Sequence, residues 1–153
     1  MSIWWSLHLR REAASVPLAR RLLVGTMETA GVDPDISYDL SVALTEACAN
    51  AVEHGGEGGT GPSSEAYRVT AYLDGERCRI EVTDAGPGFP GAPPVVRPVR
   101  AVPTDAEHGR GLCLIRELAD HVHIGNTPGY GGGAMVSFDK IIKWRKDAPL
   151  MAV

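Results

Sequence analysis

The sequence lacks several features that would assign it to common classes of protein. No apolar run approaches the roughly 18 residues of a membrane-spanning helix, and no cysteines are spaced as the C-x-x-C of a zinc or redox site. Positive charge is not in excess: 15 lysines and arginines stand against 19 aspartates and glutamates, which argues against a basic nucleic-acid surface. Aromatic residues make up only 6% of the chain, but a hydrophobic fraction of 44% argues against intrinsic disorder.

The N-terminus and the cysteines indicate a cytoplasmic protein. The first nine residues are apolar, but this run is too short for a signal peptide, and Arg10 and Arg11 follow it instead of preceding it. The cysteines are odd in number and widely spaced, so we expect reduced, mostly buried thiols, two in helices and one in a strand. They are Cys48, Cys78 and Cys113.

A single domain of alternating helices and strands is expected. A chain of 153 residues can build one self-sufficient core, so residues 1–153 are treated as one domain. Hydrophobic periodicity and turn signals predict the elements in chain order: a strand at 3–10, helices at about 15–30 and 36–54, strands at 66–73 and 77–83, a helix at about 108–120, and strands at 121–126 and 134–144. The tail at about 147–153 is expected to fray.

Short-range signals mark where some of these elements begin or turn. Ser15 is predicted to cap the first helix, and Asp33 or Asp35 the second. The dipeptide Asp74-Gly75 joins two stretches that alternate between apolar and polar residues, and this pattern predicts a β-hairpin.

The predicted helix at 36–54 carries the first candidate site. Glu46 and Asn50 lie one turn apart on the same flank, with their Cα atoms about 6 Å apart along the axis. A carboxylate and a carboxamide so placed can hold a hydrated divalent cation and a water or hydroxyl beside it. The alternative is a plain solvated flank. Both residues lie off the apolar stripe formed by Leu40, Leu44, Ala47, Cys48 and Ala51.

The second candidate site follows the strand at 77–83. Asp84, Gly86 and Gly88 form the pattern D-x-G-x-G. The carboxylate can accept a hydrogen bond from an exocyclic amine such as the adenine N6, and the glycines let a flat ring or a phosphate approach the backbone without a Cβ in the way. A simple Asp-Gly-Pro-Gly turn is the alternative.

Two further segments are rich in glycine or proline. Residues 55–64 lack the Gly-Lys-Ser/Thr ending of a P-loop and are interpreted as a flexible connector. Residues 89–108 show no periodicity, which in a compact domain indicates either disorder or a functional lid. Its Arg97 and Arg100 either reach phosphates or are solvated loop charges. The stretch Gly109-Arg110-Gly111-Leu112 then opens a helix, whose free N–H groups and dipole suit a phosphate.

The order of these boxes is more informative than any one of them. E-x-x-x-N on a helix, D-x-G-x-G after a strand, a lid and G-x-G-L at a helix start together resemble the GHKL ATPase superfamily. The wording L-T-E-A-x-x-N-A-V-E-H-G and E-H-G-R-G-L-x-L-I-R is similar to the bacterial anti-sigma factor and serine-protein kinase branch. The resemblance covers about residues 4–143. It implies an α/β (α+β) two-layer sandwich of the Bergerat type, with a mixed sheet, helices on one face and ATP between the helices and the lid.

The resemblance also implies roles for individual residues. Glu46 matches the catalytic general base, Asn50 the single protein ligand to Mg²⁺, and Asp84 the residue that recognises the adenine amine. Gly86 and Gly88 match the backbone that accommodates the adenine base. The lid end and the helix start that hold the phosphates are matched by Gly109, Arg110, Gly111 and Leu112.

One position departs from the family pattern. Ala134 stands where the family usually has a threonine, whose hydroxyl helps to bind the adenine aspartate and an ordered water. A hydrogen bond of this kind is worth about 1 kcal/mol, or several-fold in affinity. Nucleotide binding is therefore expected to be weaker, unless Ser137 or a water takes the place of the hydroxyl.

The function implied is an ATP- and Mg²⁺-dependent anti-sigma factor with serine-protein kinase activity toward an anti-anti-sigma partner, acting as a homodimer and regulating transcription by partner switching. Direct binding to nucleic acid or to a membrane is not expected. The alternative is a non-catalytic module that sequesters a sigma factor, with weak or absent nucleotide binding. The ATPase module of a histidine kinase is less favoured, because it normally accompanies a phospho-acceptor helical hairpin that this sequence does not contain. Trp4 and Trp5 are candidates for the dimer surface or for the core.

Overall fold

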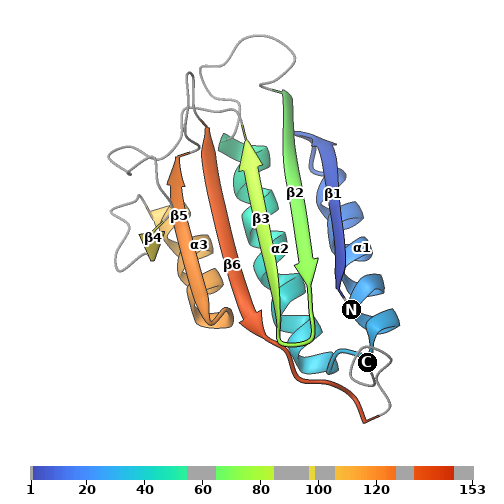
Figure 1. Ribbon diagram of the computed structural model, residues 1–153. Coiled ribbons are helices and arrows are strands. Elements are labelled where there is room, and N and C mark those ends of the chain that lie inside the picture. The colour runs from blue at the N-terminus through green and yellow to red at the C-terminus, as the bar shows by residue number, and fades with distance from the viewer. Residues whose placement is uncertain (1, 55–64, 85–96, 99–105, 127–132, 147–153) are drawn as a thin grey trace.

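The computed structural model describes residues 2–54, 65–84, 97–98, 106–126 and 133–146, with the backbone alone for 97–98 and 106–110. These residues form two layers, a sheet and three helices that cover one of its faces (Figure 1). The helices are α1 (Ser15–Ala30), α2 (Pro34–His54) and α3 (Ala106–Leu118). The strands, in their order across the sheet, are β1 (Ile3–Arg10), β2 (Ala66–Leu73), β3 (Arg77–Asp84), β6 (Ala134–Ile141), β5 (His121–Asn126) and β4 (Arg97–Pro98).

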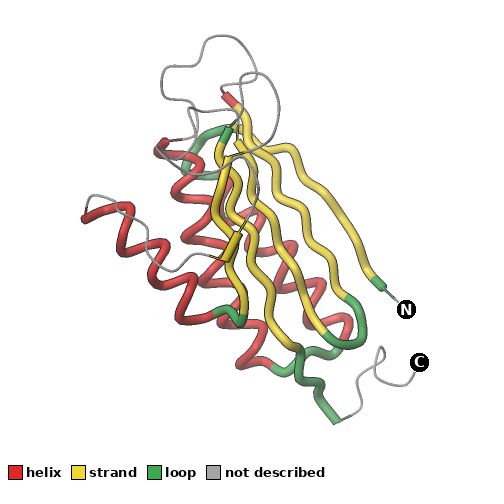
Figure 2. Tube along the Cα trace, turned by 60° about the vertical axis from the view of Figure 1, so that its left-hand side comes forward, coloured by secondary structure: helices red, strands yellow, loops and turns green. Residues whose placement is uncertain are grey.

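The predicted two-layer α+β sandwich with helices on one face is confirmed, as a view along the two layers makes plain (Figure 2). One detail differs from the resemblance, which implies a mixed sheet: every strand pair among the described residues is antiparallel. The hairpin from β2 to β3 and the short connection from β5 to β6 can only produce antiparallel neighbours. β6 then enters between β3 and β5 and runs antiparallel to both.

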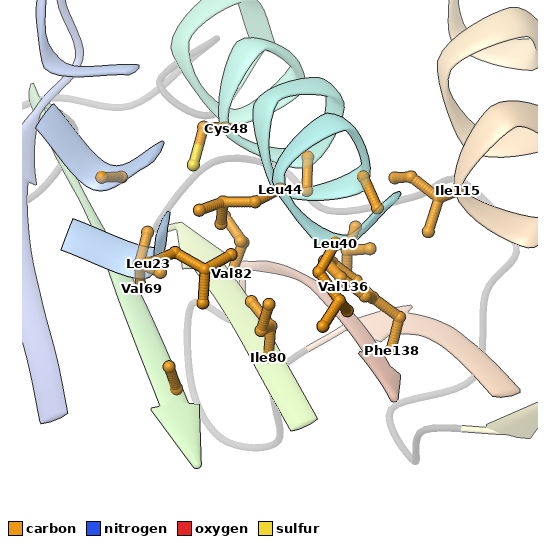
Figure 3. Packing of buried hydrophobic residues seen from close by; sticks show 14 of the residues in the cluster. Leu23, Leu40, Leu44, Cys48, Val69, Ile80, Val82, Ile115, Val136 and Phe138 are labelled. Atoms are coloured by element: carbon orange, nitrogen blue, oxygen red, sulfur yellow. The ribbon is translucent and has the colours of Figure 1, made fainter. Parts of the chain in front are cut away.

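The core lies between the sheet and the helices (Figure 3). Alternate residues of each strand point to the helices, as the pleat requires, and the central strands contribute Val69, Ile80, Val82, Val136 and Phe138. All three helices also contribute apolar side chains to this core: Leu23 of α1, Leu40 and Leu44 of α2, and Ile115 of α3. α2 lies between α1 and α3 and packs over β3 and β6, so its two flanks face the neighbouring helices.

Ser15 does not cap α1, contrary to the prediction. It is the first helical residue, and Ala14 occupies the cap position without a side-chain hydrogen bond. The Ser15 hydroxyl donates to the carbonyl oxygen of Glu12 at 2.7 Å and lies 2.6 Å from the Tyr67 hydroxyl in the core. Burial raises the pKa of Tyr67 to about 12. A serine that sequence alone assigns to a helix end thus serves a buried contact with β2.

The predicted cap of α2 and the predicted hairpin are both confirmed. Asp33, not Asp35, caps α2, because its Oδ1 accepts the N–H of Asp35 at 2.8 Å. Asp74 accepts the N–H groups of Glu76 and Arg77 at 2.7 and 2.9 Å, which closes the turn between β2 and β3. The hydrogen bond from the Arg77 backbone lowers the pKa of Asp74.

Some boundaries differ from the prediction. β3 continues to Asp84, β6 ends at Ile141, and α3 begins at Ala106, before the glycines. Within the stretch predicted to lack periodicity, β4 pairs with β5. The connector at 55–64, the rest of the predicted lid up to residue 105, Arg100 among it, and the tail at 147–153 lie outside the described residues.

The three cysteines are free. Cys48 in α2 and Cys78 in β3 are buried, and burial raises the pKa of each thiol to about 12. Cys113 in α3 is exposed. The expected placement of two cysteines in helices and one in a strand is confirmed, and burial holds for two of them.

The two tryptophans of β1 point to opposite sides of an edge strand. Trp4 is 64% exposed. Trp5 is half-buried, and its Nε1–H donates to the hydroxyl of Thr26 in α1 at 3.1 Å. Trp5 therefore belongs to the packing of the fold, and Trp4 alone stays a candidate for a contact surface. Among the described helices, none is long and apolar enough to cross a membrane.

Candidate functional site

The second half of α2 presents Glu46 and Asn50 on one flank, as the sequence predicts. The helix forms because its apolar positions recur every three or four residues and are buried against the sheet, with Leu44, Ala47 and Ala51 at 1% exposure or less. Glu46 and Asn50 are both half-buried. The two side chains are thus neither in the core nor freely solvated.

α3 brings a second sequence box against this flank. Gly111 lies so close to α2 that a Cβ added to it would stand 3.3 Å from Oε2 of Glu46. The next residue, Leu112, is 3% exposed and packs into the core. Two boxes that are far apart in the sequence therefore meet at one place, and a glycine is what leaves room for the carboxylate.

The start of α3 corrects one part of the sequence argument. Only the first four N–H groups of a helix lack partners within it, and α3 begins at Ala106. Within α3 these groups end at His108, so Gly109, Arg110, Gly111 and Leu112 already lie past the free N–H groups. The side chain of Arg110 is outside the described part, as are Gly86 and Gly88.

Asp84 stands at the end of β3, on the face of the sheet that the helices cover, as the alternation with buried Val82 requires. Its Oδ1 accepts the backbone N–H of Ala134, the first residue of β6, at 3.2 Å. The carboxylate of Asp84 therefore has a local partner even though position 134 is not a threonine, because the backbone N–H of Ala134 donates to it.

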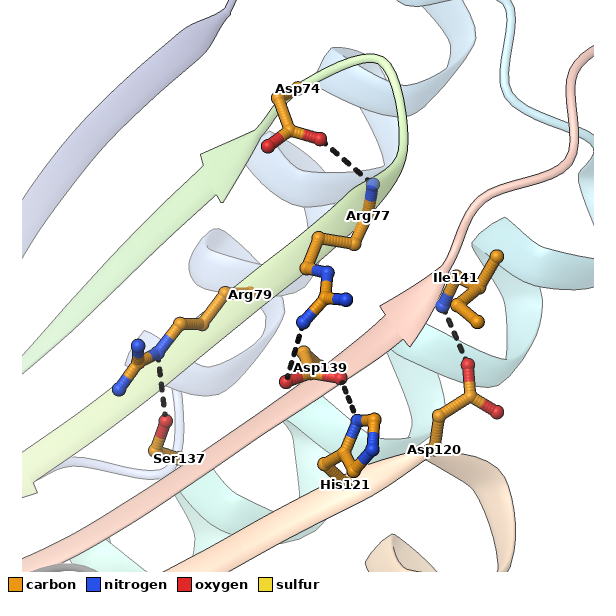
Figure 4. A network of polar contacts seen from close by, with 8 residues as sticks. All are labelled: Asp74, Arg77, Arg79, Asp120, His121, Ser137, Asp139 and Ile141. Carbon is orange, nitrogen blue, oxygen red and sulfur yellow. Dashed lines mark hydrogen bonds and ion pairs between the residues drawn. The ribbon is translucent and has the colours of Figure 1, made fainter.

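The suggestion that Ser137 replaces the threonine hydroxyl is wrong. Val136 and Phe138 point into the core, so Ser137 between them points to the other face of the sheet. There it accepts a hydrogen bond from Nε of Arg79 at 3.2 Å (Figure 4). On the same face Asp139 contacts His121 Nδ1 at 2.8 Å and Arg77 at 3.9 Å. This polar network belongs to the uncovered face and takes no part in the candidate site.

Two surface hollows lie away from these residues. One, of about 610 Å³, runs between α1 and the start of β1 and includes Leu18, Leu22 and Gly25. The other, of about 400 Å³, lies at the opposite end of α2 and includes Ser37 and Tyr38. Neither contains Glu46, Asn50 or Asp84, and neither has the charged groups converging on one point that a phosphate site needs.

Sequence reasoning missed Arg11. Its guanidinium donates to the carbonyl oxygens of Ala51 and Val52 at the C-terminal end of α2, at 3.2 and 2.8 Å. No local pattern links an arginine after a strand to the end of a distant helix. The four unpaired carbonyls that every helix end carries were the only signal that some donor was required there.

Comparison with protein families matches residues 9–140 to the histidine kinase-like ATPase domain. Similar proteins include an anti-sigma F factor of Thermoanaerobacter sp. (strain X514), 29% identical over 105 residues, which are 67% of this chain and 71% of the relative. The serine-protein kinase RsbW of Bacillus pumilus (strain SAFR-032) is 34% identical over 116 residues, 71% of this chain and 70% of the relative.

A solved structure shares the fold. The crystal structure of the RsbU and RsbW domains of Rv1364c from Mycobacterium tuberculosis matches with a TM-score of 0.61 at 20% identity. The match covers 91% of this chain and 33% of that one, so this chain spans about a third of its length. The family match extends from the end of β1 nearly to the end of β6 and includes every described residue of the candidate site. The chain belongs to the family of histidine kinase-like ATPase domains, a membership that implies ATP binding.

Proposed function

We propose that this chain is an ATP- and Mg²⁺-dependent serine-protein kinase that also binds a sigma factor and exchanges it for an anti-anti-sigma partner. The observation that carries the proposal is the close approach of Gly111 in α3 to the carboxylate of Glu46 in α2. This approach brings the half-buried Glu46 next to α3, the helix to which the family resemblance assigns phosphate binding. Asn50 lies one turn further along α2. The names of the relatives, anti-sigma F factor and serine-protein kinase, support the class of activity.

Glu46 is the proposed general base. A carboxylate at the junction of two packed helices can accept the proton of a serine hydroxyl that is brought within hydrogen-bond reach. Phosphoryl transfer depends mainly on positioning and on electrostatic stabilisation. The approach of α3 at Gly111 places this carboxylate where the two helices meet, which supports the first of these needs.

Asn50 is the proposed ligand to Mg²⁺. Among the described residues, no group of three or more histidine, cysteine, aspartate or glutamate side chains is placed to hold a metal. A single amide oxygen suits Mg²⁺, which keeps several waters and takes further ligands from phosphates. Bound Mg²⁺–ATP supplies the phosphoryl group together with the charge that neutralises it. Gly109 and Arg110, next to the N-terminal turn of α3, are proposed to bind phosphate oxygens.

Asp84 is the proposed partner of the adenine amine. Its contact with the N–H of Ala134 orients the carboxylate from the neighbouring strand, without a threonine hydroxyl. Gly86 and Gly88 follow it directly in the sequence and are proposed to leave the backbone open to the ring. The chemistry of these side chains fits a nucleotide: Asp84 offers an acceptor for the amine of the base, and Asn50 and Glu46 offer an amide and a carboxylate for the phosphate end.

The proposal extends to the setting of the protein. We propose that the protein acts in the cytoplasm as a homodimer, that its partners are a sigma factor and an anti-anti-sigma protein, and that it does not bind nucleic acid or a membrane directly. The partners are proposed from the printed names of the relatives. The exposed Trp4 on edge strand β1 is a candidate for the surface between the two copies.

The test compares Glu46→Gln with the matched control Glu53→Gln, which removes the same charge from an exposed position of the same helix. The expected result is that Glu46→Gln binds ATP like the parent but transfers phosphate to the anti-anti-sigma partner at least about a hundredfold more slowly, the usual contribution of a general base. Glu53→Gln is expected to retain both properties. Equal transfer rates in the two variants would remove Glu46 from the mechanism.

The non-catalytic alternative is favoured by one observation, Ala134 in place of threonine. Calorimetric titration with ATP and Mg²⁺ separates the two functions. Measurable binding that is lost in Asp84→Asn supports the kinase. An absence of binding heat in the parent protein supports a module that only sequesters its partner.

A further inference from the structure

The guanidinium of Arg11 closes the C-terminal end of α2. Nε donates to the carbonyl oxygen of Ala51 at 3.2 Å, and Nη2 donates to that of Val52 at 2.8 Å. The last four carbonyls of a helix have no partner within it, and α2 ends at His54. Arg11 thus satisfies one of these four, the carbonyl of Val52, and donates a second hydrogen bond to the carbonyl of Ala51 in the same turn; its positive charge complements the negative end of the helix dipole.

The backbone of Arg11 is itself fixed by the sheet. Arg11 follows β1 directly, and its N–H donates to the carbonyl oxygen of Glu65 at 2.7 Å. Glu65 precedes β2, and β1 and β2 are paired as far as Arg10 and Ala66. A half-buried side chain therefore connects the end of α2 to a rigid part of the sheet. The two contacts of Arg11 also lie on either side of the segment 55–64, one at the end of α2 and one at Glu65.

We infer that Arg11 is a positioning residue that holds the last turn of α2 in place and, through it, Asn50. Asn50 immediately precedes Ala51 and Val52, the two residues that Arg11 binds. The ends of helices open first, so the amide of Asn50 lies where a loosened turn displaces it. Glu46 lies one turn deeper, next to Gly111 of α3, and is expected to stay in place without Arg11. This inference rests on the proposed role of Asn50 as the ligand to Mg²⁺.

The experiment measures the affinity for ADP, which undergoes no transfer, with saturating Mg²⁺ and again with EDTA. The ratio of the two affinities is the enhancement by Mg²⁺. Arg11→Met is expected to lower this enhancement about tenfold, the scale of a lost charge-assisted hydrogen bond. The affinity in EDTA is expected to stay within about twofold of the parent, because the adenine end of the site is untouched.

Arg10→Met is the matched control. It removes the same charge one position earlier, from a side chain that is 85% exposed and contacts only Glu12 at 3.9 Å among the described ion pairs. The enhancement by Mg²⁺ is expected to be unchanged in this variant. Amide hydrogen exchange gives a second readout: protection of residues 51–54 is expected to fall in Arg11→Met and to remain in Arg10→Met.

Asn50→Ala separates failure of this inference from failure of the proposed function. If Asn50→Ala keeps the enhancement by Mg²⁺, the proposed ligand is wrong, whatever Arg11 does. If Asn50→Ala loses the enhancement while Arg11→Met keeps it, Arg11 does not position the ligand. If Arg11→Met does not fold, the same measurements are made on Arg11→Lys, which keeps the charge, with Arg10→Lys as its control. A smaller loss of the same sign is then expected, and an unchanged enhancement overturns the inference.

Discussion

Replacing Gly111 with alanine adds one methyl group at the contact between α3 and α2. The new Cβ would stand 3.3 Å from Oε2 of Glu46, a distance tighter than most contacts that a Cβ makes in proteins. The neighbour therefore has to give by a few tenths of an ångström. It can do so, because the contact atom is the end of a rotatable side chain. The substitution thus moves the proposed general base and little else.

The expected effects on stability and on activity have opposite signs. Alanine in a helix interior is favoured over glycine by about 0.5–1 kcal/mol, and the left-handed glycine among the described residues is Gly31, not Gly111. Gly111→Ala is therefore expected to unfold at the same denaturant concentration as the parent or a higher one. Displacing a reacting group by less than 1 Å is expected to slow phosphoryl transfer about tenfold, or about 1.4 kcal/mol in the barrier.

The assay pairs urea unfolding with single-turnover transfer to the anti-anti-sigma partner and with the affinity for ATP. Gly25→Ala is the control, because Gly25 is also helical and an added Cβ there meets nothing within 4 Å. This control is expected to gain the helical stabilisation of about 0.5–1 kcal/mol with no change in transfer. In a Glu46→Gln background, Gly111→Ala is expected to slow transfer no further, because the group that it displaces has already lost its function.

Two results would refute this reasoning. If Gly111→Ala transfers phosphate as fast as the parent, the contact with Glu46 has no bearing on catalysis. If instead it abolishes ATP binding and leaves the transfer rate of the bound fraction intact, Gly111 serves the nucleotide and not the carboxylate.

Three other predictions concern single side chains. Asp74→Ala is expected to lower the free energy of unfolding by about 1 kcal/mol at neutral pH. Because folding lowers the pKa of this carboxyl, the difference between variant and parent should shrink as the pH falls below about 4, which urea unfolding at several pH values can measure. In native protein at pH 8, a thiol reagent is expected to modify the exposed Cys113 rapidly and to spare Cys48 and Cys78, whose pKa burial raises to about 12; all three should react after unfolding. Lys140→Met should destabilise the fold by about 1.5–3 kcal/mol and loosen α3 in hydrogen exchange, because the ammonium donates at 2.6 Å to a carbonyl at the end of that helix; unchanged protection of α3 would contradict this role.

Sequence alone determined the features that depend on neighbours along the chain. The helical spacing of Leu40, Leu44 and Ala47 was enough to predict α2 and to place Glu46 and Asn50 on one flank of it, because one turn of helix fixes which residues share a face. The hairpin at Asp74 followed from turn chemistry in the same way. The order of the boxes then carried the family resemblance, which the match over residues 9–140 confirms.

Tertiary structure decided which of these groups meet. The phosphate role of Gly111 stays a prediction, and the approach of α3 to α2 adds a contact that the sequence did not indicate, with Glu46. The pairing of β3 with β6 provides Asp84 with a backbone donor from Ala134, and the pleat turns Ser137 away to the other face. Arg11 lies next to the end of α2 because β1, which it follows, is paired with β2 in the sheet. Such contacts depend on register and on the packing of two layers, and neither is encoded in the residues next to each other in the chain.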